Sequence, residues 1–222
     1  MIPTQTVENY LKTIYLAQMG GKGTLVPMGH LASALGVVPG TATTMVKTLA
    51  ESGLAHYEPY MGVRLTPAGE KLASLVLRRH RLIELFLVKV LGMSWAEVHD
   101  EAERLEHAVS ERLIDRIDDM LGRPDVDPHG DPIPTAEGTI PQQDHVDLTA
   151  APVGAPLVVT RVLDQDADFL RFMEERQLKP GSQVVIESRD LAADALRLRS
   201  SGGPATTIGL RVASKVLVKL KS

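Results

Sequence analysis

Apolar residues recur three and four positions apart through the first 121 residues, which is the spacing of helices that bury one face. This spacing predicts helices over residues 7–19, 27–35, 41–52, 66–91 and 94–121. Between the third and fourth of these, short apolar runs at 54–57 and 62–65 predict a hairpin. Three helices followed by a hairpin is the order of a winged helix-turn-helix.

The pattern changes after residue 121. Residues 122–143 are rich in Pro, Gly and Asp, a composition typical of a linker or an extended surface segment. Beyond them, one helix is expected at 167–176 among β-type runs at 157–159, 184–186, 195–198, 207–210 and 216–218. So many short strands in so short a segment predict a small barrel. The chain is therefore expected to be mainly α with a small all-β domain.

The formal net charge of −4 conceals a division along the chain. Residues 1–96 hold nine Lys and Arg against five Asp and Glu, residues 97–148 hold four against fifteen, and residues 149–222 hold eleven against eight. A mildly basic first part suits a polyanion, and a strongly acidic middle part suits cations. The basic excess is small, so charge alone does not establish nucleic-acid binding.

Composition narrows the chemistry and the compartment. The chain has no cysteine, which excludes disulfides and thiolate metal ligands. Its first residues carry neither a basic segment nor an apolar one, so no secretory signal is expected. The most apolar stretch, residues 72–91, is interrupted by charged side chains and favours a buried helix over a membrane span. We expect a cytoplasmic protein that does not bind membranes.

Residues 99–107 are rich in side chains that bind metals. If this segment is part of one continuous helix, Glu103, Glu106 and His107 converge on one side, because residues three and four apart share a face. His99 lies one turn before Glu103 on the same helix. The segment therefore predicts a cation site.

The preceding helix carries a second pair of this kind, His80 and Glu84, four residues apart. Two helices that each present imidazole and carboxylate groups can enclose a divalent cation. An ordinary solvated acidic face is the alternative. Against it, Glu106 and His99 fall at the edge of the apolar stripe of their helix, where charge is costly unless it is paired or bound to metal.

The helix at 41–52 has the small polar surface that a DNA-reading helix needs to enter the major groove. The candidate DNA contacts, on this helix and on the hairpin, are Pro39, Gly40, Thr41, Thr43, Thr44, Lys47, Tyr60 and Arg64. The helix face lacks Arg, Asn and Gln, which favours readout through methyl groups and DNA shape. A winged helix that binds protein, or that is purely structural, is the alternative.

Several separate motifs resemble the diphtheria-toxin-repressor family of metal-dependent transcriptional regulators. In family order they are Tyr10-Leu11-Lys12-Thr13-Ile14-Tyr15, Val46-Lys47-Thr48-Leu49, Leu65-Thr66-Pro67-Ala68-Gly69, Arg79-His80-Arg81-Leu82-Ile83-Glu84, Val98-His99-Asp100-Glu101, Glu106-His107 and Pro128-His129-Gly130-Asp131-Pro132-Ile133-Pro134. The resemblance covers residues 1 to about 140, and the segment at 178–182 resembles the SH3-like domain of longer members. It implies a winged DNA-binding domain at 1–74, a helical metal-binding and dimerisation domain at 75–143, and an SH3-like barrel at 144–222.

The resemblance implies a primary metal site whose ligands are Asn9, His80, Glu103, Glu106 and His107. Glu103 occupies the position of the cysteine in the iron-responsive branch. Carboxylates are harder ligands than thiolates and suit Mn²⁺, so the chain resembles the manganese-responsive branch more, with Fe²⁺ as the alternative. Two positions depart from the family pattern. Asn9 replaces an Asp, and Lys12 replaces the Glu that supports a closely spaced pair of metals in small members.

The resemblance also implies a second metal site that uses Glu84 and His99 together with ligands from the third domain. The candidates there are Asp164, Asp166 and Asp168, for which an acidic turn that caps the following helix is the alternative. Asp127 occupies a position where relatives often have Cys, and its carboxylate could also coordinate. For Asp127 and His129, a structural role in the loop is the favoured interpretation.

The sequence therefore leads to one main hypothesis, a homodimer that binds palindromic operator DNA when charged with Mn²⁺ or Fe²⁺. The expected dimer contacts are the apolar surfaces around Leu85, Phe86, Val109, Leu113 and Ile117. A metalloenzyme is disfavoured because the sequence shows no nucleophile motif and no Gly-rich phosphate loop. A winged-helix regulator that senses an organic ligand is the other alternative.

Overall fold

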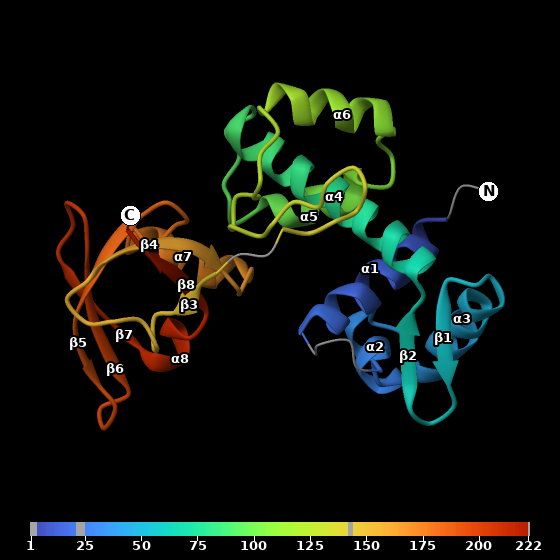
Figure 1. The fold of residues 1–222 in the computed structure, drawn as a ribbon, viewed down its shortest axis with the longest axis horizontal. Coiled ribbons are helices and arrows are strands. Elements are labelled where there is room, and N and C mark those ends of the chain that lie inside the picture. The colour runs from blue at the N-terminus through green and yellow to red at the C-terminus, as the bar shows by residue number, and fades with distance from the viewer. Residues whose placement is uncertain (1–3, 21–24, 142–143, 222) are drawn as a thin grey trace. The chain divides into compact units, whose positions relative to one another are not determined.

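The computed structural model describes residues 4–20, 25–141 and 144–221. The helices within these ranges are α1 (Gln5–Gly20), α2 (Met28–Ala34), α3 (Pro39–Glu51), α4 (Pro67–Lys89), α5 (Val98–Leu105), α6 (Glu111–Met120), α7 (Ala167–Glu175) and α8 (Leu210–Ala213) (Figure 1). The strands are β1 (Ala55–Glu58), β2 (Gly62–Leu65), β3 (Val146–Asp147), β4 (Pro156–Val162), β5 (Gln183–Asp190), β6 (Ala195–Ser200), β7 (Ala205–Gly209) and β8 (Val216–Leu220).

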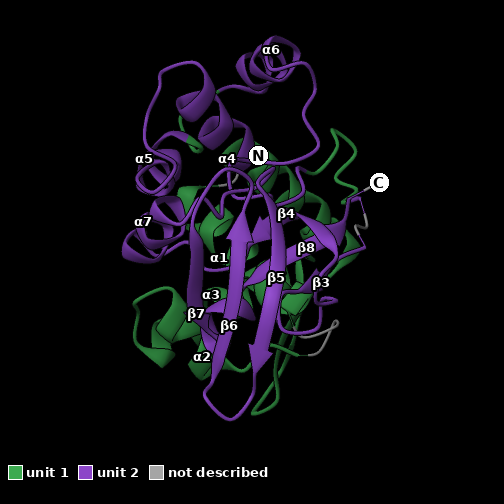
Figure 2. Cartoon of the chain, turned by 90° about the vertical axis from the view of Figure 1, so that its left-hand side faces the viewer, with its two compact units in different colours: residues 1–80, 106–109, 134–140 green, residues 81–105, 110–133, 141–222 purple. Residues whose placement is uncertain are grey.

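The chain divides into two compact units, shown in different colours in Figure 2. The first unit comprises residues 1–80, 106–109 and 134–140, and the second comprises residues 81–105, 110–133 and 141–222. The boundary between the units falls within α4, so the metal-binding motifs of the sequence are distributed over both.

The first unit contains the predicted winged helix-turn-helix. Its core is formed by apolar side chains of α1, α2 and α3, among them Leu11, Ile14, Leu31, Val46 and Leu49, each at most 1% exposed. Strands β1 and β2 pair antiparallel, and Figure 1 shows this hairpin next to α3. The helices and hairpin predicted for this part of the chain are therefore confirmed, with ends displaced by a few residues at most.

A backbone bridge joins the wing to the segment before α2. Val26 and Val63 exchange two hydrogen bonds, of 2.8 and 3.0 Å. A Cβ atom on Gly62 would lie 2.5 Å from the carbonyl oxygen of Val26, and Gly62 has a φ of 144°. Only glycine fits there without displacing backbone, so Gly62 fixes how closely the wing approaches the core.

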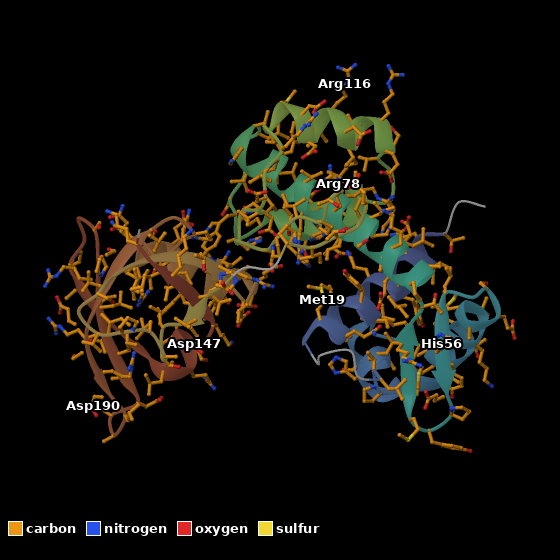
Figure 3. The ribbon with its side chains drawn as sticks, viewed as in Figure 1. Met19, His56, Arg78, Arg116, Asp147 and Asp190 are labelled. Carbon is orange, nitrogen blue, oxygen red and sulfur yellow. The ribbon has the colours of Figure 1, made fainter. Side chains whose placement is uncertain are left out.

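Helix α4 is long but not uniformly apolar. It buries Arg78 and His80 in its first-unit part, and Arg81 and Glu84 in its second-unit part. Arg78, labelled in Figure 3, donates to the carbonyl oxygen of Pro134 at 2.9 Å. Of the helices in the described ranges, none combines the length and apolar character needed to span a membrane.

The second unit contains an antiparallel sheet with the strand order β3-β8-β4-β5-β6-β7 (Figure 1). Alternation along β6 shows why these residues form strands. Leu196 and Leu198 are buried in the core, while Arg197 and Arg199 are exposed and both donate to Glu187 on β5. Strand β3 and the short helix α8 were not predicted, and residue 210 belongs to α8 rather than to a strand.

The core of this sheet extends beyond the β domain. Trp95 and Ala96, which lie between α4 and α5, are buried in the same apolar cluster as Leu170 and Met173 of α7. Trp95 also stacks on His129, with ring centroids 5.6 Å apart. The β domain and this part of the helical segment therefore share one core.

The single helix predicted at 94–121 was wrong. The structure has α5 and α6 instead, separated by a turn at 106–110. Ser110 caps α6, because its side-chain oxygen accepts from the backbone nitrogen of Leu113 at 3.3 Å. As a result Glu106 and His107 lie in the turn and not on a helical face.

The apolar stripe that the single helix implied is also interrupted. Leu105 and Leu113 are 38% and 48% exposed, whereas Ile114 and Ile117 of α6 are buried. Arg116 of α6 is exposed, and Figure 3 shows its side chain pointing away from the helix. Of the residues expected at a dimer contact, Leu85 and Ile117 are buried within the chain and Leu113 is exposed.

Candidate metal centres and nucleic-acid interface

Glu106 is the centre of a buried cluster in the first unit, which we call the first cluster. Its other members are Glu8, Lys12, His80 and His107. The side chain of Glu106 is fully buried, and its two oxygens contact different elements. Oε1 accepts from Nζ of Lys12 on α1 at 2.6 Å, and Oε2 lies 2.5 Å from Nδ1 of His80 on α4. Burial acts to raise the pKa of Glu106, but the hydrogen bonds and charges of His80 and Lys12 outweigh it and lower the pKa. Glu106 is therefore an anion at neutral pH.

His107 is oriented by an acidic residue that the sequence did not single out. Nδ1 of His107 lies 2.5 Å from Oε2 of Glu8 on α1, and the other oxygen of Glu8 accepts from Arg79 at 2.5 Å. With Nδ1 engaged in this way, Nε2 of His107 lies 3.3 Å from Oε1 of Glu106. A carboxylate behind an imidazole is the arrangement that fixes a histidine ligand for a metal.

A signal for Glu8 is present in the sequence. It lies four residues before Lys12 and next to Asn9, so it shares the face of α1 that approaches the cluster. It was missed because the resemblance pointed to Asn9 alone.

Several buried polar atoms of the first unit have no hydrogen-bond partner among the described residues. Two of them, Oδ1 of Asn9 and Nε2 of His107, are atoms that can bind a metal ion. A buried polar atom without a partner costs free energy, so such atoms indicate a missing ligand. The His107 nitrogen lies beside the Glu106 carboxylate, and imidazole nitrogen, carboxylate oxygen and amide oxygen are ligand types that fit a divalent cation of borderline to hard character.

Glu103 and His99 lie on α5 in the second unit. Nε2 of His99 lies 3.9 Å from Oε1 of Glu103, and Nδ1 of His99 lies 3.3 Å from Oε1 of Glu84 on α4. Both side chains are partly exposed, whereas Glu84 is buried. The structure thus brings His99 to Glu84, as the resemblance implied.

A second buried cluster lies wholly within the second unit. Glu84, Asp127 and His129 each place one ligand atom so that the three atoms lie within 4.8 Å of one another. All three residues are at most 3% exposed. Glu84 comes from α4, and the other two come from the loop that follows α6.

Asp127 and His129 each keep one side-chain atom available to a ligand after the hydrogen bonds of this loop are formed. Oδ1 of Asp127 accepts from the backbone nitrogens of His129 and Asp131, whereas its Oδ2 has no hydrogen-bond partner among the described residues. Nε2 of His129 donates to the carbonyl oxygen of Trp95 at 2.8 Å. The lone pair of a neutral His129 is therefore on Nδ1, 3.8 Å from Oε2 of Glu84.

The β domain holds this loop in place. The backbone nitrogen of Val162 donates to the carbonyl oxygen of His129 at 2.9 Å. A Cβ atom on Gly130 would collide with the carbonyl oxygen of Thr160, and Gly130 has a φ of 87°. Asp131 forms ion pairs with Arg161 and Arg81. The loop thus has both a structural role, as predicted, and a cluster of ligand atoms, which was not predicted for His129.

Negative charge in this cluster is not fully balanced. Burial, together with the nearby carboxylates of Asp131 and Glu84, raises the pKa of Asp127 to about 7. For His129, burial acts to lower the pKa, but contact with Glu84 and Asp127 outweighs it and raises the pKa. Arg81 lies 3.6 Å from Oδ2 of Asp127 and compensates only in part. These groups fit a divalent cation.

The acidic residues before α7 have other partners. Asp164 accepts from Nζ of Lys215 at 2.5 Å, a contact that lowers its pKa, and Asp168 pairs with Arg171 at 2.6 Å on an exposed turn. Asp166 caps α7 by accepting from the backbone nitrogens of Asp168 and Phe169, so the alternative interpretation is confirmed for Asp166. Neither Asp164 nor Asp168 is among the three residues of the second cluster.

The exposed surface of α3 is formed by the predicted polar residues. Thr41, Thr44 and Lys47 are exposed, whereas Ala42, Val46 and Leu49 are buried. The hydroxyls of Thr43 and Thr44 donate to the carbonyl oxygens of Pro39 and Gly40 at 2.8 and 3.0 Å. These hydroxyls can still accept a hydrogen bond but have no proton left to donate, so they limit readout to acceptance and methyl contacts.

The tip of the wing is fully exposed. Tyr60, at the hairpin turn, has a positive φ of 67° and is completely exposed, and Met61 beside it is 65% exposed. Arg64 on β2 is also exposed. Large exposed side chains on a two-stranded wing beside a helix with a small polar surface form a shape suited to double-stranded DNA.

Comparisons with known proteins agree with this geometry. Residues 3–63 match the family described as iron dependent repressor, N-terminal DNA binding domain, and residues 66–135 match its metal binding and dimerisation domain. Residues 146–220 match the FeoA domain.

Relatives cover most of the chain. The iron-dependent repressor IdeR of Mycobacterium tuberculosis is 34% identical over 195 residues, which is 82% of this chain and 84% of that protein. The HTH-type transcriptional regulator MntR of Lysinibacillus sphaericus is 38% identical over 120 residues, which is 54% of this chain and 84% of that protein. A solved manganese-dependent transcriptional repressor in complex with manganese has a TM-score of 0.87 and 38% identity, covering 97% of this chain and 100% of that one.

The winged helix, the helical segment with buried carboxylates and imidazoles, and the β domain define a metal-dependent transcriptional regulator. The chain belongs to the iron-dependent repressor family, which includes the diphtheria toxin repressor, IdeR and MntR. This confirms the resemblance noted from the sequence motifs, including the SH3-like third domain.

Proposed function

We propose that this chain is a repressor of manganese or iron homeostasis that binds Mn²⁺, with Fe²⁺ as the alternative, and then binds palindromic operator DNA as a homodimer in the cytoplasm. The observation that carries the proposal is the buried group of Glu84, Asp127 and His129, in which Oδ2 of Asp127 and Nδ1 of His129 form no hydrogen bond with any described residue. Because buried polar atoms are normally hydrogen-bonded, these two atoms support a bound ion at this group.

The ligand types support Mn²⁺ or Fe²⁺. The buried atoms proposed to bind the metal are carboxylate oxygens, an amide oxygen and imidazole nitrogens, and the chain has no cysteine. Hard oxygen ligands with imidazole suit these ions, while thiolates would favour softer ones. Relatives carry names for both metals, IdeR for iron and the solved repressor for manganese.

We assign the ligands as follows. In the first unit we propose Asn9, His80, Glu106 and His107. In the second unit we propose Glu84, His99 and Asp127, and we add His129. Glu103, Asp164 and Asp168 stay predictions from the family resemblance, and so does the division at 1–74, 75–143 and 144–222.

The residues of the first cluster connect ligand binding to the winged domain. Glu106 joins Lys12 of α1 and His80 of α4, and His107 reaches Glu8 of α1. Helix α1 contributes Leu11 and Ile14 to the core of the winged domain. A bound ion would supply the positive charge that holds the buried carboxylates together. We therefore expect an ion that shifts the turn at 106–109 to shift α1 and the DNA-reading elements packed on it.

The proposal is tested by a mobility-shift assay. A duplex is first selected from a random-sequence pool by the full-length protein in the presence of Mn²⁺, and binding is then measured with Mn²⁺ and with chelator. We expect a slower-migrating complex only with Mn²⁺, with a stoichiometry of two chains or a multiple of two. Equal binding with chelator would reject metal control.

One rival is favoured by a specific observation. The second unit contains a cavity of 730 Å³ whose lining includes Leu85, Trp95 and Val159. This volume suits an organic ligand. Calorimetry in which Mn²⁺ at micromolar concentration produces no binding heat would favour that regulator class over ours. The named relatives are regulators, so we propose no catalytic role.

Lys47 gives a test of the DNA interface. In the Lys47→Ala variant we expect binding to all duplex sequences to weaken similarly, and the slope of log affinity against log salt to fall by about 1, because one phosphate contact is lost. Lys71→Ala is the matched control, since Lys71 lies on α4 and only donates to the carbonyl oxygen of Ala136. Loss of binding to one sequence alone would indicate a base contact instead.

Glu8 gives a test of the first cluster. Glu8→Gln removes the charge behind His107, so we expect Mn²⁺ affinity at that cluster to fall about 10- to 100-fold, the usual effect of losing a residue that orients a ligand. Titration calorimetry with Mn²⁺ measures this, with Glu70→Gln on the exposed side of α4 as control. An unchanged affinity would mean that Glu8 serves only its ion pair with Arg79.

A further inference from the structure

Lys12 is a positive charge buried at the first cluster. Its side chain is only 8% exposed, and no other lysine in the described ranges is buried. Lysine is rarely buried unless its ammonium group is paired, because removing the charge from water is costly. The pairing here is the 2.6 Å contact with Oε1 of the fully buried Glu106.

Glu106 has no oxygen left that is not already engaged by the chain. Nζ of Lys12 contacts Oε1, and Nδ1 of His80 contacts Oε2 at 2.5 Å. His107 also approaches Oε1, with Nε2 at 3.3 Å. A cation that binds Glu106 must therefore share or replace the ammonium group of Lys12.

We propose that Lys12 is an internal competitor of the divalent cation at Glu106, and that it sets the metal concentration at which the first cluster fills. The proposal rests on the proposed function, because it requires that Glu106 binds metal.

An ammonium group and a divalent cation seek the same carboxylate lone pairs, and at this depth little water is present to screen their repulsion. Lys12 is carried by α1, whose neighbours Leu11 and Ile14 are fully buried, so its main chain cannot move far. The metal-free cluster is then kept ordered by the ion pair, and the ion has to compete with a tethered group that is always present.

The test measures Mn²⁺ binding to the full-length chain by titration calorimetry. Lys12→Met keeps the length and apolar character of the side chain and removes its charge. We expect Mn²⁺ to bind the first cluster about 10-fold more tightly, within the range typical of coupled binding events. Lys12→Arg keeps the charge and should bind no more tightly than wild type, and Lys71→Met is the control that should leave affinity unchanged.

A second readout separates competition from a purely structural role. Without metal, Lys12→Met should unfold at lower temperature than wild type, because Glu106 loses a partner. With saturating Mn²⁺ the difference should shrink or vanish. In a Glu106→Gln background, Lys12→Met should have no further effect on affinity, because the contested carboxylate is gone.

The outcomes distinguish the two proposals. If wild type binds no Mn²⁺, the proposed function fails. If wild type binds Mn²⁺ and Lys12→Met binds it equally well or more weakly, only the role of Lys12 fails. Should Lys12→Met not fold, the wild-type chain with ¹⁵N-labelled lysine is used. In its NMR spectrum, the slowly exchanging signal of the Lys12 ammonium group should shift or disappear when Cd²⁺ is added. Cd²⁺ replaces Mn²⁺ here because Mn²⁺ is paramagnetic and would broaden any nearby signal. An unchanged signal would overturn the proposal.

Discussion

The Glu106→Gln variant is expected to bind the selected duplex no better with Mn²⁺ than with chelator. Glutamine has almost the same shape as glutamate but no negative charge, so it keeps the packing of the turn while removing the anion that Lys12 and His80 surround. We expect Mn²⁺ affinity at the first cluster to fall more than about 100-fold, beyond the effect of losing a supporting residue. Calorimetry and mobility shift measure the two effects separately.

Glutamine is preferred to alanine for a physical reason. Both variants remove the counter-charge of Lys12, but the amide oxygen of glutamine can still accept a hydrogen bond from its ammonium group. Alanine would leave that buried group with neither a counter-charge nor an acceptor, and breaking a buried pair in this way typically costs about 3–5 kcal/mol, enough to unfold a marginal domain. Glu137→Gln, on the exposed part of the first unit, is the matched control. A Glu106→Gln protein that remains folded and still responds to Mn²⁺ would remove the first cluster from the regulatory mechanism.

The second large effect concerns the pH dependence of stability in the metal-free protein. Asp127 has a pKa of about 7 in the folded chain, whereas an aspartate in an unfolded chain titrates near 3.9. Between these values the folded chain retains a proton that the unfolded chain has released. Stability therefore falls as pH rises, and the loss is complete above about pH 7. His129 acts in the same direction, because its pKa is also raised in the fold.

We therefore expect Asp127→Asn to be more stable than wild type at about pH 8 without metal, by a few kcal/mol and at most about 4, and to differ little at about pH 5. Asparagine keeps an oxygen for the backbone nitrogens of His129 and Asp131 and adds no charge beside Glu84 and Arg81. With saturating Mn²⁺ at the higher pH the order should reverse, since wild type gains a ligand that the variant lacks. Thermal unfolding in chelator and in Mn²⁺ measures both. If the stabilities of the two proteins changed with pH in parallel, the raised pKa of Asp127 would be contradicted.

Local patterns were sufficient to predict the winged domain. The helices α1 to α4 and the hairpin follow from apolar spacing, and the buried Ala42, Val46 and Leu49 follow from the face that α3 must turn inward. The same logic failed at 94–121. There the apolar residues stay three and four positions apart even where the chain leaves the helix between α5 and α6. Ser110, which caps the start of α6, was the signal that a new helix begins.

The clusters depend on contacts that no local pattern contains. Lys12 and Glu106 are 94 positions apart, and Glu8 and His107 are 99 apart. The family resemblance supplied Glu106 and His107 as ligands, but it could not show that Lys12 engages one and Glu8 the other. His129 was assigned to the loop because only the fold reveals that Trp95 occupies Nε2 and leaves Nδ1 facing Glu84.

The loop of the second cluster is fastened to the β domain, through Val162 on His129, through Gly130 against Thr160, and through Arg161 on Asp131. If the second cluster binds metal as proposed, sensitivity to metal is partly a property of the carboxyl-terminal domain, even though most of the proposed ligands lie elsewhere. Evolution can retune the set point of such a sensor by substituting residues of the sheet while every coordinating side chain stays the same.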